Sequence, residues 1–211
     1  MGESHLFAAA ALGYRFWFVA EEHLLSATHG LWEPGVNRAA CWRSTGHPAP
    51  QGDCTCGLHA YHELSAPLRH TNSFARHWRP GDRDEAVMIG AVAGRGALEV
   101  HWSGWRAAEG QVLGLLATPV QIASGLAAEI AGRYRVPYFG QKAELEAHAR
   151  RLAAPIDPAF RPDPPLSGPA LERFARRYRR SAGDPEEVAE LAEELSLRLD
   201  EVISLAEYLG L

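Results

Sequence analysis

Residues 86–118 read AVMIGAVAGRGALEVHWSGWRAAEGQVLGLLAT, three apolar-rich runs with glycine between them. A Ser-Gly pair at 103–104 separates the second run from the third. Short apolar runs bounded by glycine are typical of consecutive antiparallel strands joined by tight turns. We therefore expect residues 86–118 to form a three-stranded antiparallel meander at the centre of the fold.

The segment before this meander also indicates strands. Residues 13–28, GYRFWFVAEEHLLSAT, place aromatic and β-branched residues before a polar Glu-Glu-His and a second apolar run, which predicts a hairpin. Residues 31–42 continue in strand-like fashion around a Trp-Glu-Pro-Gly turn at 32–35. Residues 57–64, GLHAYHEL, predict a short helix that starts directly after Cys56.

Beyond the meander the apolar period changes. Residues 120–134 and 141–152 carry apolar residues at helical spacing. The pattern as a whole predicts an α+β fold. We expect an antiparallel β-rich core with an inserted Cys/His metal loop, followed by helices and a C-terminal helical tail.

The composition divides the 211 residues into three parts. Residues 1–151 read as one α+β domain that contains the metal loop at 41–62. Six prolines between 155 and 169 predict a stiff, extended linker over 152–169. Residues 170–211 have their own helical apolar pattern and form the predicted tail.

Charge and hydropathy narrow the class of protein. The chain is 46% apolar and 22% charged, which is typical of a folded globular protein. A net charge of −5 argues against a general polyanion binder. No stretch reaches the roughly 20 apolar residues that span a bilayer, so we expect a cytoplasmic protein without membrane contact.

The most informative motif is CWRSTGHPAPQGDCTCG at 41–57, which contains all three cysteines of the chain. Its ligand pattern is Cys41-x5-His47-x6-Cys54-x-Cys56. In a reducing compartment, clustered cysteines indicate metal ligands or redox groups rather than a disulfide framework. Cys₃His is a common tetrahedral set for structural zinc. We therefore predict a zinc site formed by these four residues.

Several alternatives remain for the loop. The cysteines can be an inert thiol cluster or a redox or nucleophilic group, and iron or an iron–sulfur cluster can replace zinc. His59 and His62 share a face of the predicted helix and compete with His47 as the fourth ligand. If His47 does not bind, the open position can hold water, and His59, His62 and Glu63 become candidate general bases.

Five short stretches resemble a group of small uncharacterised actinobacterial proteins. They are GYRFW at 13–17, WEPG at 32–35, Cys41, HPAP at 47–50 and CTCGLHA at 54–60. In that group a C-x-C-G motif precedes a short helix and a strand meander ending in G-[WY]-R-A, matched here by GWRAAEG at 104–110. The resemblance covers about residues 13–135. It implies that the cysteine loop and the strands form one unit, and it implies no activity.

Trp105 and Arg106 follow the predicted turn of the meander. Tryptophans on strand-like runs are expected in the core. An arginine at a strand end is more often a surface ion-pair partner than an anion-binding group. We expect Trp105 in the core and Arg106 on the surface.

The tail has an arginine-rich helix before an acidic helical pair. The arginines are Arg173, Arg176, Arg177, Arg179 and Arg180, and they are candidate nucleic-acid contacts. The helical pair resembles a helix-turn-helix in outline, but from residue 184 onward it carries nine acids against Arg198, which disfavours contact with phosphates. Its apolar positions predict an interaction face for a protein partner or a second copy: Val188, Leu191, Leu195, Val202, Ile203 and Leu209.

These patterns favour one function over two others. The first is a zinc-binding, non-catalytic accessory or regulatory protein that acts through protein interaction. The second is a DNA-binding regulator that uses the C-terminal helices. The third is a zinc-dependent hydrolase with an open metal position.

Overall fold

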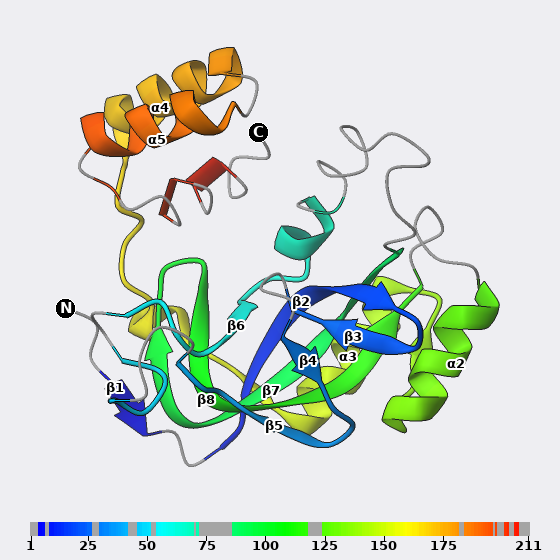
Figure 1. Cartoon of the computed structure of the whole chain (residues 1–211). Coiled ribbons are helices and arrows are strands. Elements are labelled where there is room, and N and C mark those ends of the chain that lie inside the picture. The colour runs from blue at the N-terminus through cyan, green and yellow to red at the C-terminus, as the bar shows by residue number, and fades with distance from the viewer. Residues whose placement is uncertain are drawn as a thin grey trace. The chain divides into compact units, whose positions relative to one another are not determined.

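A computed structural model describes most of the chain as two compact units, Met1–Arg161 and Pro162–Leu211. The described residues are 4–6, 9–26, 30–41, 46–51, 54–69, 71, 86–117, 124–181, 184–195, 197, 201–202 and 205–206. The first unit contains a single mixed sheet, two helices that pack with it and a short helical stretch at 65–69 (Figure 1). The predicted α+β class is confirmed.

Ten described strands make up this sheet. They are β1 Ser4–Leu6, β2 Ala11–Ala20, β3 His23–Leu25, β4 Leu31–Trp32, β5 Val36–Arg38, β6 Leu58–Tyr61, β7 Ala86–Val100, β8 Gly104–Leu116, β9 Tyr138–Phe139 and β10 Ala154–Pro155. Their pairings are antiparallel except that β9 pairs parallel with β8 and β10 pairs parallel with β2. The pairings β2–β7, β7–β8, β8–β6 and β6–β2 form a closed circuit, which curls the sheet around one of its faces.

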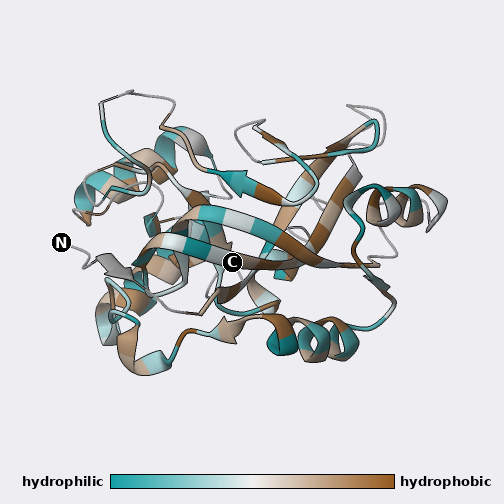
Figure 2. Cartoon of the chain, turned by 90° about the horizontal axis from the view of Figure 1, so that it is seen from below, coloured by the Kyte–Doolittle hydropathy of each residue, from teal (hydrophilic) through white to brown (hydrophobic). Residues whose placement is uncertain are grey.

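Both faces of the sheet are apolar and buried, as the alternation along the long strands requires. On β2, Trp17 and Val19 enter one core cluster, whereas Tyr14 and Phe16 enter the other. Helix α2 (Ser124–Tyr134) contributes to the first cluster and helix α3 (Lys142–Leu152) to the second. The mixed colouring of the helices in Figure 2 reflects this amphipathic pattern. Both predicted helices are therefore confirmed.

Residues 86–116 form two long strands rather than three. β7 runs without a turn from Ala86 to Val100 and pairs with β8. The break expected between the first two runs is instead an irregularity between Arg95 and Leu98, where Gly96 has φ +75°. The glycine-rich stretch forms a local bulge around the left-handed Gly96, and the strand continues beyond it instead of turning back. The predicted hairpin at 13–28 is confirmed by β2 and β3.

The segment after Cys56 is a strand, not the predicted helix. β6 pairs antiparallel with β8, with Leu58 opposite Ala107 and Tyr61 opposite Gly104. Gly57 has a φ of +123°. This conformation lies outside the α-helical region, and glycine adopts it more readily than other residues. The chain therefore enters β6 extended, and helical residues begin only at 65–69.

The predicted linker is shorter than expected, because its first part belongs to the first unit. β10 pairs with β2, and Ile156 is buried in the core cluster that contains Trp17. A 3₁₀ turn, η1 (Pro158–Phe160), follows before the boundary at Arg161. Proline is accepted in a short edge strand because the N–H that it lacks is not needed for pairing. A proline-rich segment can therefore pair with β2 at this position.

The second unit is helical, as predicted. It contains α4 (Gly168–Ser181), α5 (Pro185–Glu194) and helical residues at 201–202 and 205–206. Asp184 caps α5 by accepting from the backbone N–H of Glu186 at 2.9 Å. None of the helices in the described part of the chain has the length and apolar character needed to cross a membrane.

A candidate metal centre

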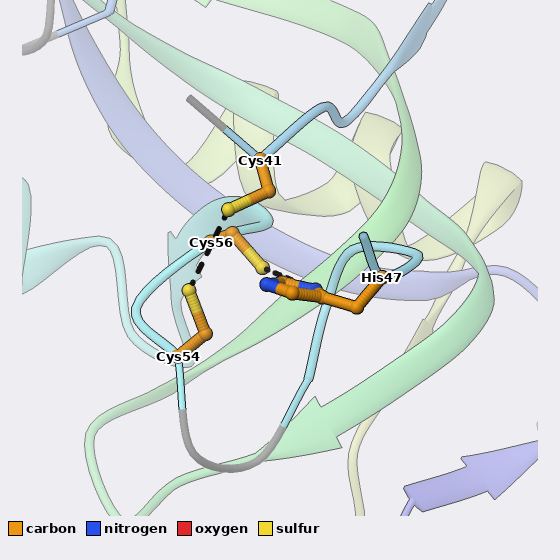
Figure 3. A group of neighbouring side chains, drawn as sticks. All are labelled: Cys41, His47, Cys54 and Cys56. Atoms are coloured by element: carbon orange, nitrogen blue, oxygen red, sulfur yellow. Dashed lines mark hydrogen bonds between the residues drawn. The ribbon is translucent and has the colours of Figure 1, made fainter. Parts of the chain in front are cut away.

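The four predicted ligands come together at one point. One ligand atom from each of Cys41, His47, Cys54 and Cys56 lies within 4.8 Å of the others, and Figure 3 shows the side chains converging. The Sγ atoms of Cys41 and Cys54 are 3.7 Å apart, and Cys56 Sγ is 3.9 Å from His47 Nδ1. Zn–S bonds of about 2.3 Å in a tetrahedron place sulfurs about 3.8 Å apart. The cluster therefore has the dimensions of a tetrahedral metal site.

Strand β8 organises the loop that carries these residues. β5, which precedes Cys41, pairs with β8 at residues 109–111, and β6, which follows Cys56, pairs with β8 at residues 104–107. The N–H of Ala39 donates to the carbonyl of Ala108 at 2.8 Å. Hydrogen bonding to β8 therefore continues from β5 to a residue only two positions before Cys41. The two ends of the loop are therefore held along one edge of one strand.

Gly57 is required directly after the last cysteine. Its φ of +123° favours glycine, and a Cβ at this position would lie 3.0 Å from Arg106 Cβ and 3.2 Å from Pro50 Cβ. The C-x-C-G motif therefore has a geometric reason for its final residue. The glycine redirects the chain from the cluster into β6.

The histidine ligand has a natural outer partner. Its Nδ1 lies 3.1 Å from the carbonyl oxygen of Pro48. In the tautomer that carries the proton on Nδ1, His47 donates to this carbonyl and keeps a lone pair on Nε2 for a metal. Metal-binding histidines usually orient the ring through such a bond. In the other tautomer the lone pair lies on Nδ1, the atom 3.9 Å from Cys56 Sγ.

Cys56 is a ligand whose protonation is affected by its surroundings. Burial raises the pKa of the Cys56 thiol, and the neighbouring Cys54 and Cys41 thiols raise it further. A metal ion binds thiolates, so binding must release protons. The geometry suits a cation, and the raised pKa of Cys56 favours its protonated thiol when no cation is bound.

Arg106 is buried, which corrects the surface position expected from sequence. Its side chain is 3% exposed and pairs with Glu99, which is 4% exposed. The guanidinium also donates to the carbonyl of Cys54 and, at 3.1 Å, to that of Cys56. The spacing of charged residues carries no signal for this role, because Glu99 and Arg106 meet only through strand register. Trp105 lies in the core, as predicted.

The third nitrogen of this guanidinium, Nε, connects to the turn between β7 and β8. Arg106 Nε donates to His101 Nε2 at 3.0 Å. Because His101 Nε2 accepts here, its 3.7 Å separation from Glu99 is a neutral contact rather than an ion pair. The carbonyl of His101 accepts from His62 Nε2 at 2.8 Å. The cysteine turn, the β7–β8 turn and the end of β6 thus form one hydrogen-bonded group.

The alternative ligands and bases lie outside the cluster. His59 is exposed on β6, and its Nε2 is 3.0 Å from the carbonyl of Thr55. His62 is buried and donates to His101, and Glu63 pairs with Arg161 at 3.3 Å. Because β6 is a strand, His59 and His62 do not share the helical face that was expected. Among the described residues, the metal-competent group contains His47 instead.

The tail residues divide into buried apolar and exposed charged sets. The five arginines of α4 are all exposed, and Arg177 pairs with Glu194 of α5. Val188, Leu191 and Val202 are buried within the chain, and Leu195 is partly buried. Ile203 and Leu209 lie outside the described residues. The roles expected for the arginines in nucleic-acid binding and for the apolar face in partner binding stay predictions.

Comparison of the chain with known protein families, with curated proteins and with solved structures found no match.

Proposed function

We propose that this protein is a zinc-binding protein whose metal has a structural role, and that it acts as an accessory or regulatory factor. The observation that supports the proposal is the Cys₃His cluster with tetrahedral spacing. Three thiolates favour zinc over magnesium or calcium, which prefer oxygen ligands. The metal would join the end of β5 to the start of β6.

The ligand count argues for a structural rather than a catalytic metal. Four protein ligands complete the zinc shell, whereas catalytic zinc keeps one position for water or substrate. The candidate bases His59, His62 and Glu63 have other partners away from the cluster. A hydrolase with an open zinc position is therefore the weaker hypothesis.

Elemental analysis of the purified chain tests the proposal. We expect close to one zinc per chain, lost in Cys54→Ser together with thermal stability. His47→Ala should lower zinc retention under chelator challenge. The matched control is His148→Ala, which removes an imidazole from α3, outside the metal loop, and should leave the zinc content unchanged. Wild-type protein that folds without any bound metal would contradict the proposal, and stoichiometric iron would replace zinc in it.

We also propose that the helical unit mediates self-association through charge. The arginines of α4 are exposed, and so are the acids of α5, namely Glu186, Glu187, Glu190, Glu193 and Glu194. Val188, Leu191 and Val202 are already buried, so the exposed charges are the larger surface that the described residues of this unit offer to a second copy. The basic helix α4 of one copy can therefore face the acidic helix α5 of another copy.

Sedimentation velocity of the full chain tests this association. We expect a dimer at low salt that dissociates as salt screens the charges over a Debye length of about 10 Å at 0.1 M. Arg176→Glu with Arg180→Glu should give a monomer at low salt. The control, Arg95→Glu with Lys142→Glu, makes the same change of net charge outside this unit and should leave the dimer intact. A monomeric wild type at low salt would rule the proposal out.

A further inference from the structure

The contacts of Arg106 go beyond those of an ordinary buried ion pair. Glu99 on β7 faces Arg106 on β8 in register, and both side chains are almost fully buried. The same guanidinium donates to the carbonyls of Cys54 and Cys56 and to His101. We infer that the Arg106–Glu99 pair positions the Cys54–Cys56 turn for metal binding and thereby sets the metal affinity of the site. This inference rests on the proposed zinc function.

The two carbonyl contacts explain how the arginine acts on the ligands. One nitrogen of the guanidinium, Nη1, donates to the carbonyls of both Cys54 and Cys56. The two carbonyls therefore converge on the arginine, and the segment between them curves around the guanidinium. Arg106 therefore fixes the backbone of both ligand residues, and Figure 3 shows their sulfurs directed toward the same centre.

Glu99 keeps the guanidinium in place for this task. A buried arginine without a counter-charge is strongly destabilising, so Glu99 makes burial beside the cysteine turn possible. Gly57 lets the chain approach Arg106 closely, because a Cβ on this residue would lie only 3.0 Å from Arg106 Cβ. The turn is thus formed against the sheet before a metal arrives. Without the pair, the metal would have to order the turn itself, and its affinity would fall.

Zinc affinity of the full-length chain provides the test. Arg106→Met combined with Glu99→Leu removes both charges, a change that buried ion pairs often tolerate without loss of stability. We expect the dissociation constant for zinc, measured by competition with a chromophoric chelator, to rise about 10–100-fold. The absorption of bound Co²⁺ should also change, because the thiolates are no longer held in one arrangement. A loss of stability alone would not alter the Co²⁺ spectrum of the bound fraction.

A second variant and a matched control make the result decisive. Arg106→Lys keeps the charge beside Glu99 but has no planar fork that reaches Glu99, His101 and the cysteine carbonyls together, and we expect a smaller loss of affinity. Arg38→Met with Glu109→Leu removes an exposed ion pair that also involves β8, and it should leave the affinity unchanged. Wild-type affinity in both Arg106 variants would overturn the inference while the zinc function stands. A wild-type chain that binds neither zinc nor cobalt would overturn both.

Discussion

At the scale of single residues, His62 shows how burial changes a side chain that sequence marks as reactive. Its spacing from His59 predicts a ligand or a base, but its Nε2 donates to the carbonyl of His101. Burial, helped by the nearby Arg161, lowers the pKa of His62 to about 4, against the opposing effects of the hydrogen bond to the His101 carbonyl and of Glu63. The imidazole is therefore neutral at physiological pH, and it connects β6 to the β7–β8 turn.

We predict that His62 makes stability depend on pH between about 6.5 and 4. The unfolded chain protonates this histidine as the pH falls below about 6.5, whereas the folded chain stays neutral until about pH 4. The free energy of unfolding should fall with acidification by about 3 kcal/mol over this interval. Urea unfolding of wild type and His62→Gln, measured across the interval, isolates this part of the pH dependence.

The metal ligands also take up protons in acid, so the comparison needs two conditions. Both proteins are unfolded with excess zinc and again with chelator. The difference between wild type and His62→Gln should keep the same slope in both conditions. Parallel stability curves for the two proteins would show that His62 does not titrate as predicted.

At the scale of elements, β8 decides both the core and the metal loop. Its outer edge receives β6, β5 and β9 in turn, and its other edge receives β7. The side chain of Trp105 lies in the core, and its Nε1 donates to the carbonyl of Leu12 at 3.0 Å. Gly13 and Gly94 give this ring its space, because a Cβ on either glycine would come within 2.7 Å of it.

We predict that Gly94→Ala destabilises the fold by about 1–3 kcal/mol, as overpacking of a filled core does. The added methyl would lie 2.6 Å from two ring carbons of Trp105. Urea unfolding measures the loss. Gly140→Ala is the matched control, since a Cβ there meets nothing within 4 Å. In Gly94→Ala with Trp105→Phe, the smaller ring should make the combined loss less than the sum of the single losses. Additive losses would contradict this steric account.

At the scale of the whole molecule, the two units differ in how they are stabilised. The buried residues of both sheet clusters lie between Ala11 and Ile156, all within the first unit. The second unit buries its own set, which includes Phe174, Leu191 and Leu205. We therefore treat residues 1–161 as a structural domain that carries the complete metal cluster.

A chain ending at Arg161 should fold by itself and bind zinc as the full chain does. We expect a cooperative unfolding transition and an unchanged zinc content, because neither sheet cluster contains a residue from the second unit. A chain ending at Leu152 is the control. It lacks β10 and the buried Ile156, so it should unfold at lower urea concentration. Aggregation of the 161-residue chain would move the domain boundary.

Composition and spacing were sufficient for the fold class, for the two helices after the meander and for the four clustered ligands. These features are local. Apolar periodicity indicates a helix or a strand directly. Three cysteines within seventeen residues are close in space because they are close in sequence. The spacing gave a wrong prediction at residues 57–64, where the apolar pattern is compatible with a helix but the chain forms strand β6. There the left-handed Gly57 and pairing with β8 override the local preference.

Only the tertiary structure decided which partners meet across the sheet. The burial of Arg106 against Glu99, the carbonyl contacts to the cysteine turn and the neutral His62 all depend on the register of β7, β8 and β6. Register brings together residues that are far apart in sequence, and a one-residue slip would turn every side chain to the opposite face. The ligands of the metal site were therefore readable from the chain, whereas the residues that hold them in place were not.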